Sequence, residues 1–516
     1  MSLPDLIEIV PLTQPVGAEI TVPGSKSITN RALILAALAD GTVTLTGALW
    51  SEDTQIMVEC LEKLGFDLRV ENDPEEFCNR TITVKGLGGK IPKGGTAEKP
   101  LELFVGNAGT AARFLSAFVC LGDGVYRLAG IPRMNERPKA ALFQALRELG
   151  YRVESEKKNE KLPVTIFGRS RGNETQTKTP KDSQSLLTSS PTGKKCKVDI
   201  SESSQFASAL LLCAKHGGWK IEVTGENADE SPYVAMTTKL IEAFPNQGGK
   251  FQIEPDASSG SYFIAASKLA PRKNRPDEKT RLDTAQRLAA LALKSSKTAN
   301  LGWRQDVGNS ARFWREMLAL AETDDKILAA AIKDIIANNS LIGIRDWPKS
   351  TWQIDAAFPK YVFPEKELGE LFSVSRENNL ADSIMTAVVI APLDHHISKF
   401  TDLGRLRLQE CERVVALRTE LTKCGAKVEE QGDTLTVYPS QLHGAEIETY
   451  NDHRMAMCFA ILGLKVPDIK IKNPACVKKT FPNFFQKLAT PPPKGLGVTI
   501  LDGSGKKLRT EDLFAD

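Results

Sequence analysis

The sequence has few of the residues that build metal centres or disulfide frameworks. Only 5 of its 516 residues are histidine, and none of them shows H-E-x-x-H or a comparable ligand spacing. The cysteines number nine, are widely scattered and form no C-x-x-C pair: Cys60, Cys78, Cys120, Cys196, Cys213, Cys411, Cys424, Cys458 and Cys476. We therefore expect reduced thiols and no metal, because disulfide and zinc sites need paired cysteines.

Long apolar runs and a surplus of charge are also missing. The best apolar stretch, Thr386–Leu393, is far short of the roughly 20 residues that a membrane span requires. The N-terminal MSLPDLIEIVPL lacks the basic and apolar segments of a secretory signal. Lysine and arginine exceed aspartate and glutamate by only 67 − 64 = 3, which gives no general argument for nucleic acid. We expect a cytoplasmic protein with no membrane or nucleic-acid partner.

What the sequence does contain is a recurring local pattern. A short β-prone run leads into a polar or glycine-bearing turn and then into a helix start rich in small residues. The pattern occurs at Glu19–Leu38, Leu103–Leu121, Val198–Lys215, Phe251–Leu269, Leu380–Leu393 and Ile447–Leu464. One such match carries little weight, because strand–turn–helix is the commonest unit of α/β proteins. Six of them, in a chain too long for one core, predict a pseudo-repeated α/β architecture, either of two domains or of a large repeat assembly.

Two stretches interrupt this pattern. Ser170–Lys195 is rich in Ser, Thr, Lys and Gly and predicts a flexible surface insertion. Leu269–Leu380 is longer and carries helical patterns, so we interpret it as an elaborated insertion.

The turns of the repeated pattern are the candidate functional sites, because a helix N-terminus offers free N–H groups to anions. Basic residues gather beside these turns and in two further loops: Lys26, Arg31, Arg113, Arg133, Arg137, Arg413, Arg454 and Lys479. Such a set suits a ligand with phosphate and carboxylate groups. Taken alone, a tripeptide such as Ser203–Gln205 or Asp452–Arg454 is more often a helix cap with a surface charge.

Two carboxylates and one histidine are candidates for proton transfer. Asp382 stands at the start of an apolar helix, where its environment could tune it as a base, although an N-cap explains it equally well. Glu410 precedes Arg413 by one turn, which an ordinary i,i+3 pair also explains. His453 is either a proton carrier or a polar turn residue.

At these residues the chain resembles a known family. Nine segments carry the resemblance: PGSKSITNRALILAAL, GNAGTAARFL, GIPRMNERP, SSQFASALLL, the SPY of Ser231–Tyr233, EPDASSGSYFIAA, DSIMTAVVIA, YNDHRMAMCFAIL and KTFPNFF. In this order they resemble the successive signatures of the 5-enolpyruvylshikimate-3-phosphate (EPSP) synthase family. The insertions resemble the eukaryotic, fungal form found within the arom multifunctional protein.

The resemblance implies a fold and an activity. The fold is a two-domain inverse α/β barrel, each domain having three βαβαββ units, six pseudo-repeats in all. The implied domains are 24–250, with the insertion 170–195, and 1–23 plus 251–516, with the insertion 269–380. The family transfers the enolpyruvyl group of phosphoenolpyruvate (PEP) to the 5-hydroxyl of shikimate 3-phosphate, with no metal or organic cofactor. We expect a monomer whose partners are these two small molecules.

The resemblance also implies roles for individual residues, which would meet in a cleft shared by the two domains. The implied catalytic residues are Lys26, Asp382 and Glu410, and which of them handles each proton transfer stays open. The implied acceptor contacts are Lys26, Ser27, Arg31, Ser203, Ser204, Gln205, Ser231, Tyr233 and Asp382. The implied PEP contacts are Lys26, Asn107, Gly109, Arg133, Gln205, Arg413, His453, Arg454 and Lys479.

The chain departs from the family pattern on the acceptor side. Where the family carries an asparagine and a lysine before the acidic Glu410, this chain has Arg405 and Gln409. The family's Gln-Gly-Asp turn corresponds to Arg304-Gln305-Asp306 in our alignment by eye. The loss of a cation leaves two alternatives open: an enolpyruvyl transferase for another alcohol, and a non-catalytic ligand-binding paralogue. Arg405 is a candidate to restore the charge.

Overall fold

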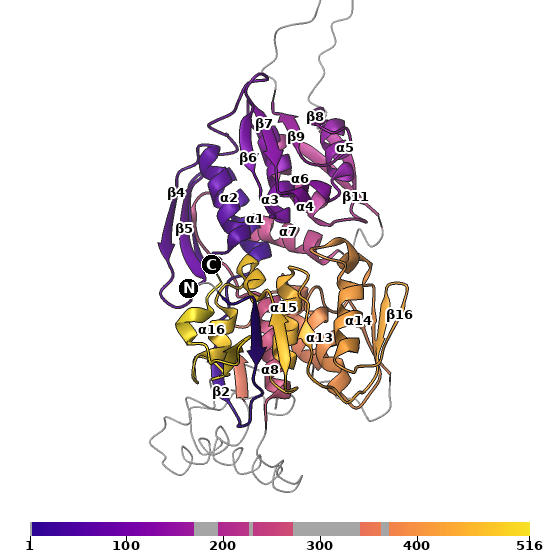
Figure 1. Cartoon of the computed structure of the whole chain (residues 1–516). Coiled ribbons are helices and arrows are strands. Elements are labelled where there is room, and N and C mark those ends of the chain that lie inside the picture. The colour runs from indigo at the N-terminus through magenta and orange to yellow at the C-terminus, as the bar shows by residue number, and fades with distance from the viewer. Residues whose placement is uncertain (1–2, 170–193, 226–230, 272–340, 363–370, 516) are drawn as a thin grey trace, which may run out of the picture. The chain divides into compact units, whose positions relative to one another are not determined.

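The computed structural model describes residues 3–169, 194–225, 231–271, 341–362 and 371–515 (Figure 1). They form two compact units. Unit 2 comprises Pro23–Glu254 and Thr351–Gln353, and unit 1 comprises Met1–Val22, Pro255–Ser350 and Ile354–Asp516. Most of the predicted insertion 170–195 lies outside the described residues, but Lys194 and Lys195 do not belong to a loop, because they open a strand.

In the described part of unit 2, the strands form two four-stranded sheets and a two-stranded one. The strand orders are β12-β3-β5-β4, β6-β7-β9-β8 and β10-β11. The bounds are β3 (Thr42–Leu49), β4 (Leu68–Asn72), β5 (Asn79–Lys85), β6 (Leu101–Phe104), β7 (Val125–Ala129), β8 (Arg152–Ser155), β9 (Val164–Phe167), β10 (Lys194–Asp199), β11 (Trp219–Thr224) and β12 (Gly249–Gln252).

Unit 1, over its described residues, has a corresponding set of sheets. Their orders are β14-β15-β17-β16, β18-β19-β1-β20 and β13-β2, so the two N-terminal strands belong to this unit. The bounds are β1 (Leu6–Ile9), β2 (Gly17–Ile20), β13 (Leu341–Ile344), β14 (Phe372–Ser375), β15 (Ser398–Thr401), β16 (Val428–Gln431), β17 (Thr434–Val437), β18 (Glu446–Ile447), β19 (Ile469–Lys472) and β20 (Ile500–Asp502).

The four larger sheets share one pairing pattern. In each of them the first two strands are parallel and the next two pairs are antiparallel, as in β6-β7-β9-β8. The same pattern holds for β12-β3-β5-β4, for β14-β15-β17-β16 and for β18-β19-β1-β20. A parallel pair needs a crossover connection, usually a helix, and α3 (Gly109–Phe118) is that helix between β6 and β7.

The interior of unit 2 is made of helices that are buried on nearly all sides. Helices α1, α3 and α6 contact one another (Figure 1), and all ten residues of α3 are buried. Small side chains such as Ala111 and Ala112 let these helices approach closely. The helices are α1 (Lys26–Leu38), α2 (Glu52–Lys63), α3, α4 (Pro132–Glu136), α5 (Ala140–Glu148), α6 (Gln205–Gly217) and α7 (Pro232–Ala243).

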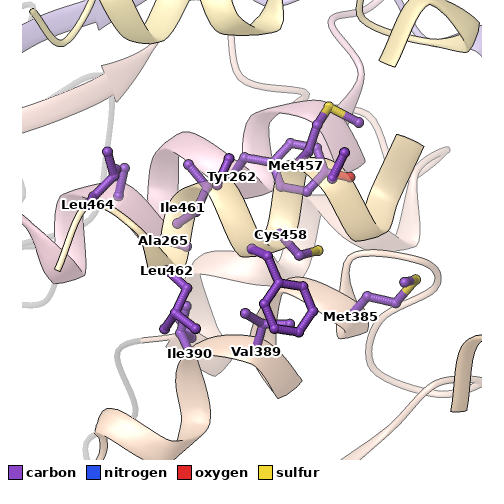
Figure 2. Packing of buried hydrophobic residues seen from close by; sticks show 14 of the residues in the cluster. Tyr262, Ala265, Met385, Val389, Ile390, Met457, Cys458, Ile461, Leu462 and Leu464 are labelled. Carbon is purple, nitrogen blue, oxygen red and sulfur yellow. The ribbon is translucent and has the colours of Figure 1, made fainter. Parts of the chain in front are cut away.

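Unit 1 has the same kind of interior, in which α8, α13 and α15 contact one another. Figure 2 shows Tyr262 of α8, Met385 and Val389 of α13, and Met457 and Ile461 of α15 packed together. Each large apolar side chain buried in this way stabilises the fold by about 1.5–3 kcal/mol. The helices are α8 (Ala257–Leu269), α12 (Phe358–Val362), α13 (Ile384–Ile390), α14 (Arg413–Lys423), α15 (His453–Leu462) and α16 (Phe484–Ala489).

The interpretation of 269–380 as one long insertion is wrong for its described C-terminal part. Strand β13 pairs in parallel with β2, and β14 forms the first, parallel pair of its sheet. Residues 272–340 and 363–370 lie outside the described part of the chain. Apart from Thr351–Gln353, which belong to unit 2, the rest of 269–380 is built into unit 1 and contributes to the polar cluster described below.

Within the described residues, no helix is both long enough and apolar enough to cross a membrane.

Candidate active site

The turn before α1 is fixed by close backbone contacts. The Gly24 amide donates to Asn79 Oδ1 at 2.8 Å, and a Cβ at Gly24 would lie 1.9 Å from the Gly47 carbonyl oxygen. Only glycine fits such an approach. The turn presents Lys26 as the first residue of α1, with Nζ 3.3 Å from Asp53 Oδ2.

Arg31 lies inside unit 2, with 1% of its surface exposed. Its Nε donates to Thr237 Oγ1 at 2.8 Å, Nη2 to Ser208 Oγ at 3.0 Å and Nη1 to the Ser27 carbonyl at 2.8 Å. The guanidinium also lies 5.2 Å from the centre of the Phe114 ring. Burial lowers the pKa of Arg31 to about 10. These contacts make Arg31, predicted to bind the acceptor, an interior cation held by neutral oxygens.

Gln205 connects two of the predicted turns. Its Oε1 accepts from Arg113 Nη1 at 3.1 Å, and its Nε2 donates to Thr110 Oγ1 at 3.4 Å. Arg113 Nη1 also donates to the Gly109 carbonyl at 3.0 Å, while the Gln205 amide donates to Ser203 Oγ at 3.3 Å. The structure therefore brings the Gly-Asn-Ala-Gly-Thr turn and the Ser-Ser-Gln turn together.

The two arginines of the basic loop 132–139 lie in different surroundings. Arg133 of α4 is half-exposed and pairs with Glu136 at 3.3 Å. Arg137 instead reaches the start of α3, where a Cβ at Gly109 would lie 2.8 Å from its Nη1. Lys139 follows, with no exposed surface. Burial and the nearby charges of Arg113 and Arg137 lower the pKa of Lys139 to about 6.

The remaining predicted residues of unit 2 lie at helix starts. Ser204 and Ser231 are the N-cap residues of α6 and α7 and are 5% and 4% exposed. The Ser231 hydroxyl is buried without a hydrogen-bond partner among the described residues. Tyr233 places its ring centre 6.0 Å from the Arg31 guanidinium, and Asn107 is half-buried in the turn before α3.

Asp382 is the centre of a polar cluster in unit 1. It lies in the turn before α13, and its side chain is 14% exposed. Three arginines approach it: Arg376 at 3.0 Å, Arg454 at 3.3 Å and Arg413 at 3.9 Å. Burial acts to raise the pKa of Asp382, but the charges of Arg454, Arg376 and Arg413 together hold it well below its ordinary value. Asp382 is therefore ionised at neutral pH.

Glu410 lies in the same cluster and is not a surface residue. Its Oε2 is 2.9 Å from Arg413 Nη2, and its Oε1 is 3.0 Å from Lys479 Nζ. Its side chain is 13% exposed. Arg413 thus lies within 4 Å of both Glu410 and Asp382, so one guanidinium bridges the two predicted proton-transfer groups.

The Asp-His-Arg turn completes the cluster. Asp452 caps α15 by accepting from the Arg454 amide at 2.8 Å, and it accepts from Arg413 Nε at 2.6 Å. Arg454 also lies 3.5 Å from the Tyr262 hydroxyl. The His453 ring is 1% exposed, with Nδ1 3.7 Å from Asp452 Oδ1. The carboxylates outweigh the effect of burial and raise the pKa of Arg413 above its ordinary value.

Sequence reasoning missed Asp355, which fixes the backbone around Asp382. Asp355 Oδ1 accepts from the Ala381 amide at 2.8 Å and from the Ser383 amide at 3.2 Å. Its other oxygen accepts from Ser258 Oγ. The carboxylate is buried and multiply bonded, so it holds both neighbours of Asp382 in place.

The position of Asp355 also revises the alignment of the Gln-Gly-Asp turn. The residues chosen for it, Arg304–Asp306, lie outside the described part of the chain. Gln353-Ile354-Asp355 has the same pattern with isoleucine in place of the glycine. A Gln-x-Asp signal was thus present in the sequence, inside the stretch interpreted as an insertion.

Gln409 and Arg376 also contact Asp382. Gln409 donates from Nε2 to Asp382 Oδ1 at 3.5 Å, and its Oε1 accepts from Arg413. Arg376, which no sequence motif marked, is 6% exposed. Arg405 lies in a 3₁₀ turn over Gly404–Leu408. Among the described residues, no group of three or more His, Cys, Asp or Glu side chains is arranged to hold a metal ion.

The fold is the one seen in solved enolpyruvyl transferases. The chain is similar to EPSP synthase from Acinetobacter baumannii, with a TM-score of 0.57 and 18% identity, over 96% of this chain and 99% of that one. It is also similar to the enolpyruvyl transferase NikO from Streptomyces tendae, with a TM-score of 0.54 and 13% identity, over 98% and 99%. At these identities the likeness concerns the fold.

The chain belongs to the EPSP synthase (3-phosphoshikimate 1-carboxyvinyltransferase) family, whose model matches residues 10–275 and 371–488. It is 34% identical to the 3-phosphoshikimate 1-carboxyvinyltransferase of Trichormus variabilis, over 94% of this chain and 98% of that one. It is 33% identical to the enzyme of the same name from Aeromonas salmonicida, over 94% and 98%. The resemblance to the arom-type form stays a prediction.

Proposed function

We propose that this chain transfers the enolpyruvyl group of PEP to the 5-hydroxyl of shikimate 3-phosphate and releases phosphate. The observation that carries the proposal is the pair of carboxylates, Asp382 and Glu410, which both lie within 4 Å of Arg413 and face different nitrogens of its guanidinium. Enolpyruvyl transfer needs a base on the acceptor hydroxyl and an acid on the methylene carbon of PEP. A cation between them is suited to bind the anionic PEP.

The proposed reaction has two steps. Asp382 takes the proton of the acceptor hydroxyl while Glu410 protonates the methylene carbon, and the acceptor oxygen bonds to the central carbon to give a tetrahedral ketal. Phosphate then leaves the ketal and takes the proton held by Asp382, while Glu410 takes back a proton from the methyl group, and the enol ether of the acceptor forms. Arg413, Arg454 and Lys479 neutralise charge on PEP and on the leaving phosphate.

Unit 2 supplies the remaining contacts in this proposal. Ser203, Ser204, Ser231 and Tyr233 bind the phosphate of the acceptor, and the buried hydroxyl of Ser231 supports this role because a ligand would give it a partner. The other proposed acceptor contacts are Lys26, Ser27, Arg31 and Gln205. The other proposed PEP contacts are Lys26, Asn107, Gly109, Arg133 and Gln205 of unit 2 and His453 of unit 1.

We further propose that the two units are the two domains of an inverse α/β barrel with three βαβαββ units each. The pairing pattern shared by the four larger sheets supports this, since a parallel pair followed by an antiparallel hairpin is what βαβαββ produces. The two-stranded sheets β10-β11 and β13-β2 would be the partly described third unit of each domain.

The test is phosphate release from PEP by the purified full-length protein, with shikimate 3-phosphate as acceptor. Release that depends on this acceptor, with formation of the enol ether, supports the proposal. Release only with another alcohol supports the second candidate, an enolpyruvyl transferase of different acceptor specificity, which Gln409 in place of the expected lysine favours. Binding of both ligands without release would indicate a non-catalytic paralogue.

A further inference from the structure

Arg376 is a buried cation whose function no sequence motif suggested. It follows β14 directly, and its amide donates to the Thr401 carbonyl at 3.1 Å. Its Nη2 donates to Asp382 Oδ1 at 3.0 Å. Its Nε is buried with no hydrogen-bond partner among the described residues. An arginine held this firmly, with a donor to spare, is suited to bind a further anion or oxygen.

The two oxygens of Asp382 face different groups. Oδ2 lies 3.3 Å from Arg454 and 3.9 Å from Arg413, both proposed PEP contacts. Oδ1 accepts from Arg376 at 3.0 Å and lies 3.5 Å from Gln409 Nε2. When PEP engages the two arginines on the Oδ2 side, Arg376 remains as the cation that holds the carboxylate.

Because position 409 is a glutamine, the Oδ1 side of Asp382 lacks the lysine charge that the family resemblance implies. Position 409 is where the family resemblance leads to a lysine, and a glutamine brings a dipole but no charge. Arg376 reaches the same carboxylate oxygen as Gln409, but from the end of β14, whereas Gln409 follows the 3₁₀ turn Gly404–Leu408. The positive charge missing from one segment is therefore present on another, next to the same atom.

Building on the proposed function, we infer that Arg376 is a positioning residue that replaces the charge absent at position 409. It holds Asp382 by Oδ1, so that Oδ2 can take the proton of the acceptor hydroxyl, and it adds a cation beside the anionic acceptor. From the sequence alone, Arg405 was the candidate to restore the missing charge. The ion pair with Asp382 favours Arg376 instead.

The test measures steady-state kinetics of Arg376→Gln, Gln409→Lys and the double variant, with Arg509→Gln as matched control. Arg509 forms an exposed pair with Asp512, outside the cluster. Arg376→Gln should lower kcat and raise KM for the acceptor, together reducing kcat/KM about 10- to 100-fold, because a charged hydrogen bond is lost. KM for PEP should change less than threefold. Adding Gln409→Lys to Arg376→Gln should raise kcat/KM for the acceptor at least about tenfold above that of Arg376→Gln alone.

A pH profile separates positioning from a general structural role. Removing Arg376 should raise the pKa of Asp382, so the acid limb of kcat/KM should shift to higher pH. Other charged or titratable groups facing this cluster are Arg413, Arg454, Lys479, Glu410, Asp452, Asp256, Asp355 and Tyr262. They are the same in each variant, so a shift seen in Arg376→Gln but not in Arg509→Gln reports on Arg376.

Three outcomes would overturn the inference while leaving the proposed function intact. Arg376→Gln could behave like Arg509→Gln, the loss could persist in the double variant, or the acid limb could stay in place. Wild-type protein that releases no phosphate with any acceptor would instead end the proposed function. In that case ¹³C NMR titration of the Asp382 carboxyl, identified by its loss in Asp382→Asn, decides the role of Arg376. Equal pKa values of Asp382 in wild type and Arg376→Gln would then contradict it.

Discussion

The two units bury cations beside helix starts but compensate them differently. In unit 2, Arg31 is surrounded by the hydroxyls of Ser208 and Thr237, a carbonyl and aromatic rings. In unit 1, Arg413 lies within 4 Å of the carboxylates of Glu410, Asp382 and Asp452.

The pKa values of the two arginines are shifted in opposite directions. Burial lowers the pKa of Arg31 to about 10. Burial also acts against the charge of Arg413, but its carboxylates more than offset it and the pKa is raised. Arg31 thus keeps a positive charge beside neutral oxygens, whereas Arg413 is neutralised in advance by carboxylates and must exchange ion pairs for a ligand. In the proposed function, a carboxylate of unit 1 serves as the base.

The largest expected effect in this comparison is on activity, from the carboxylate in unit 1. Asp382→Asn removes the proposed base but keeps the shape, so phosphate release with shikimate 3-phosphate should fall about 10²- to 10⁴-fold. Asp512→Asn, at the exposed pair with Arg509, is the matched control. An Asp382→Asn variant with near wild-type turnover would remove Asp382 from the role of base.

The next effect is on stability. Arg413→Met removes the buried arginine of Asp452, while Glu410 keeps its pair with Lys479. Breaking a buried ion pair from one side costs about 3–5 kcal/mol. Denaturant unfolding of the full chain measures this cost. Arg418→Met, which breaks a half-exposed pair with Glu430, should change the free energy of unfolding by less than about 1 kcal/mol.

Arg31→Met is the counterpart in unit 2 and should cost less than Arg413→Met. The Ser208 and Thr237 hydroxyls remain bonded to each other at 2.8 Å and to the Tyr233 carbonyl, so no charge is left uncompensated. We expect a loss of about 1–2 kcal/mol in the same denaturation experiment. A loss equal to that of Arg413→Met would show that neutral oxygens and carboxylates compensate a buried arginine equally, and the comparison would fail.

The smallest expected effect is a gain in stability when Lys139 of unit 2 is replaced. Its pKa is lowered from 10.5 in the unfolded chain to about 6 in the fold, so the folded state binds fewer protons between these values. The stability of the wild type therefore rises with pH over this window. Lys139→Met should raise the free energy of unfolding at pH 7 by about 1 kcal/mol, because a poorly compensated buried amine is removed.

The advantage of Lys139→Met over the wild type should shrink as the pH approaches 10. Thermal unfolding at pH 7 and pH 10 measures it, with the exposed Lys215→Met as control. A gain that does not depend on pH would contradict the buried neutral amine and point to better packing alone.

Much of the architecture was predictable from local patterns. The six turns at which helices were expected are followed in the structure by α1, α3, α6, α8, α13 and α15. Glycine, proline and capping residues before a run of small apolar side chains are signals within a few residues of each other. Glu410 does not belong to the helix that follows it, since α14 begins three residues later, at Arg413.

The errors came from contacts between distant segments. Asp355 stands 27 residues before Asp382, and Arg376 carries no motif, so neither could be linked to the cluster without the fold. Arg133 and Arg137 stand in one loop, and only the course of the chain places Arg137 against Gly109.

The sequence by itself determined the family, the helix starts and the presence of cations and carboxylates suited to an anionic ligand, because each of these depends on residues close together along the chain. Tertiary structure decided which cation meets which carboxylate, and so which charges are neutralised. That depends on distances across the fold: three carboxylates lie within 4 Å of Arg413, whereas two hydroxyls and a carbonyl accept from Arg31.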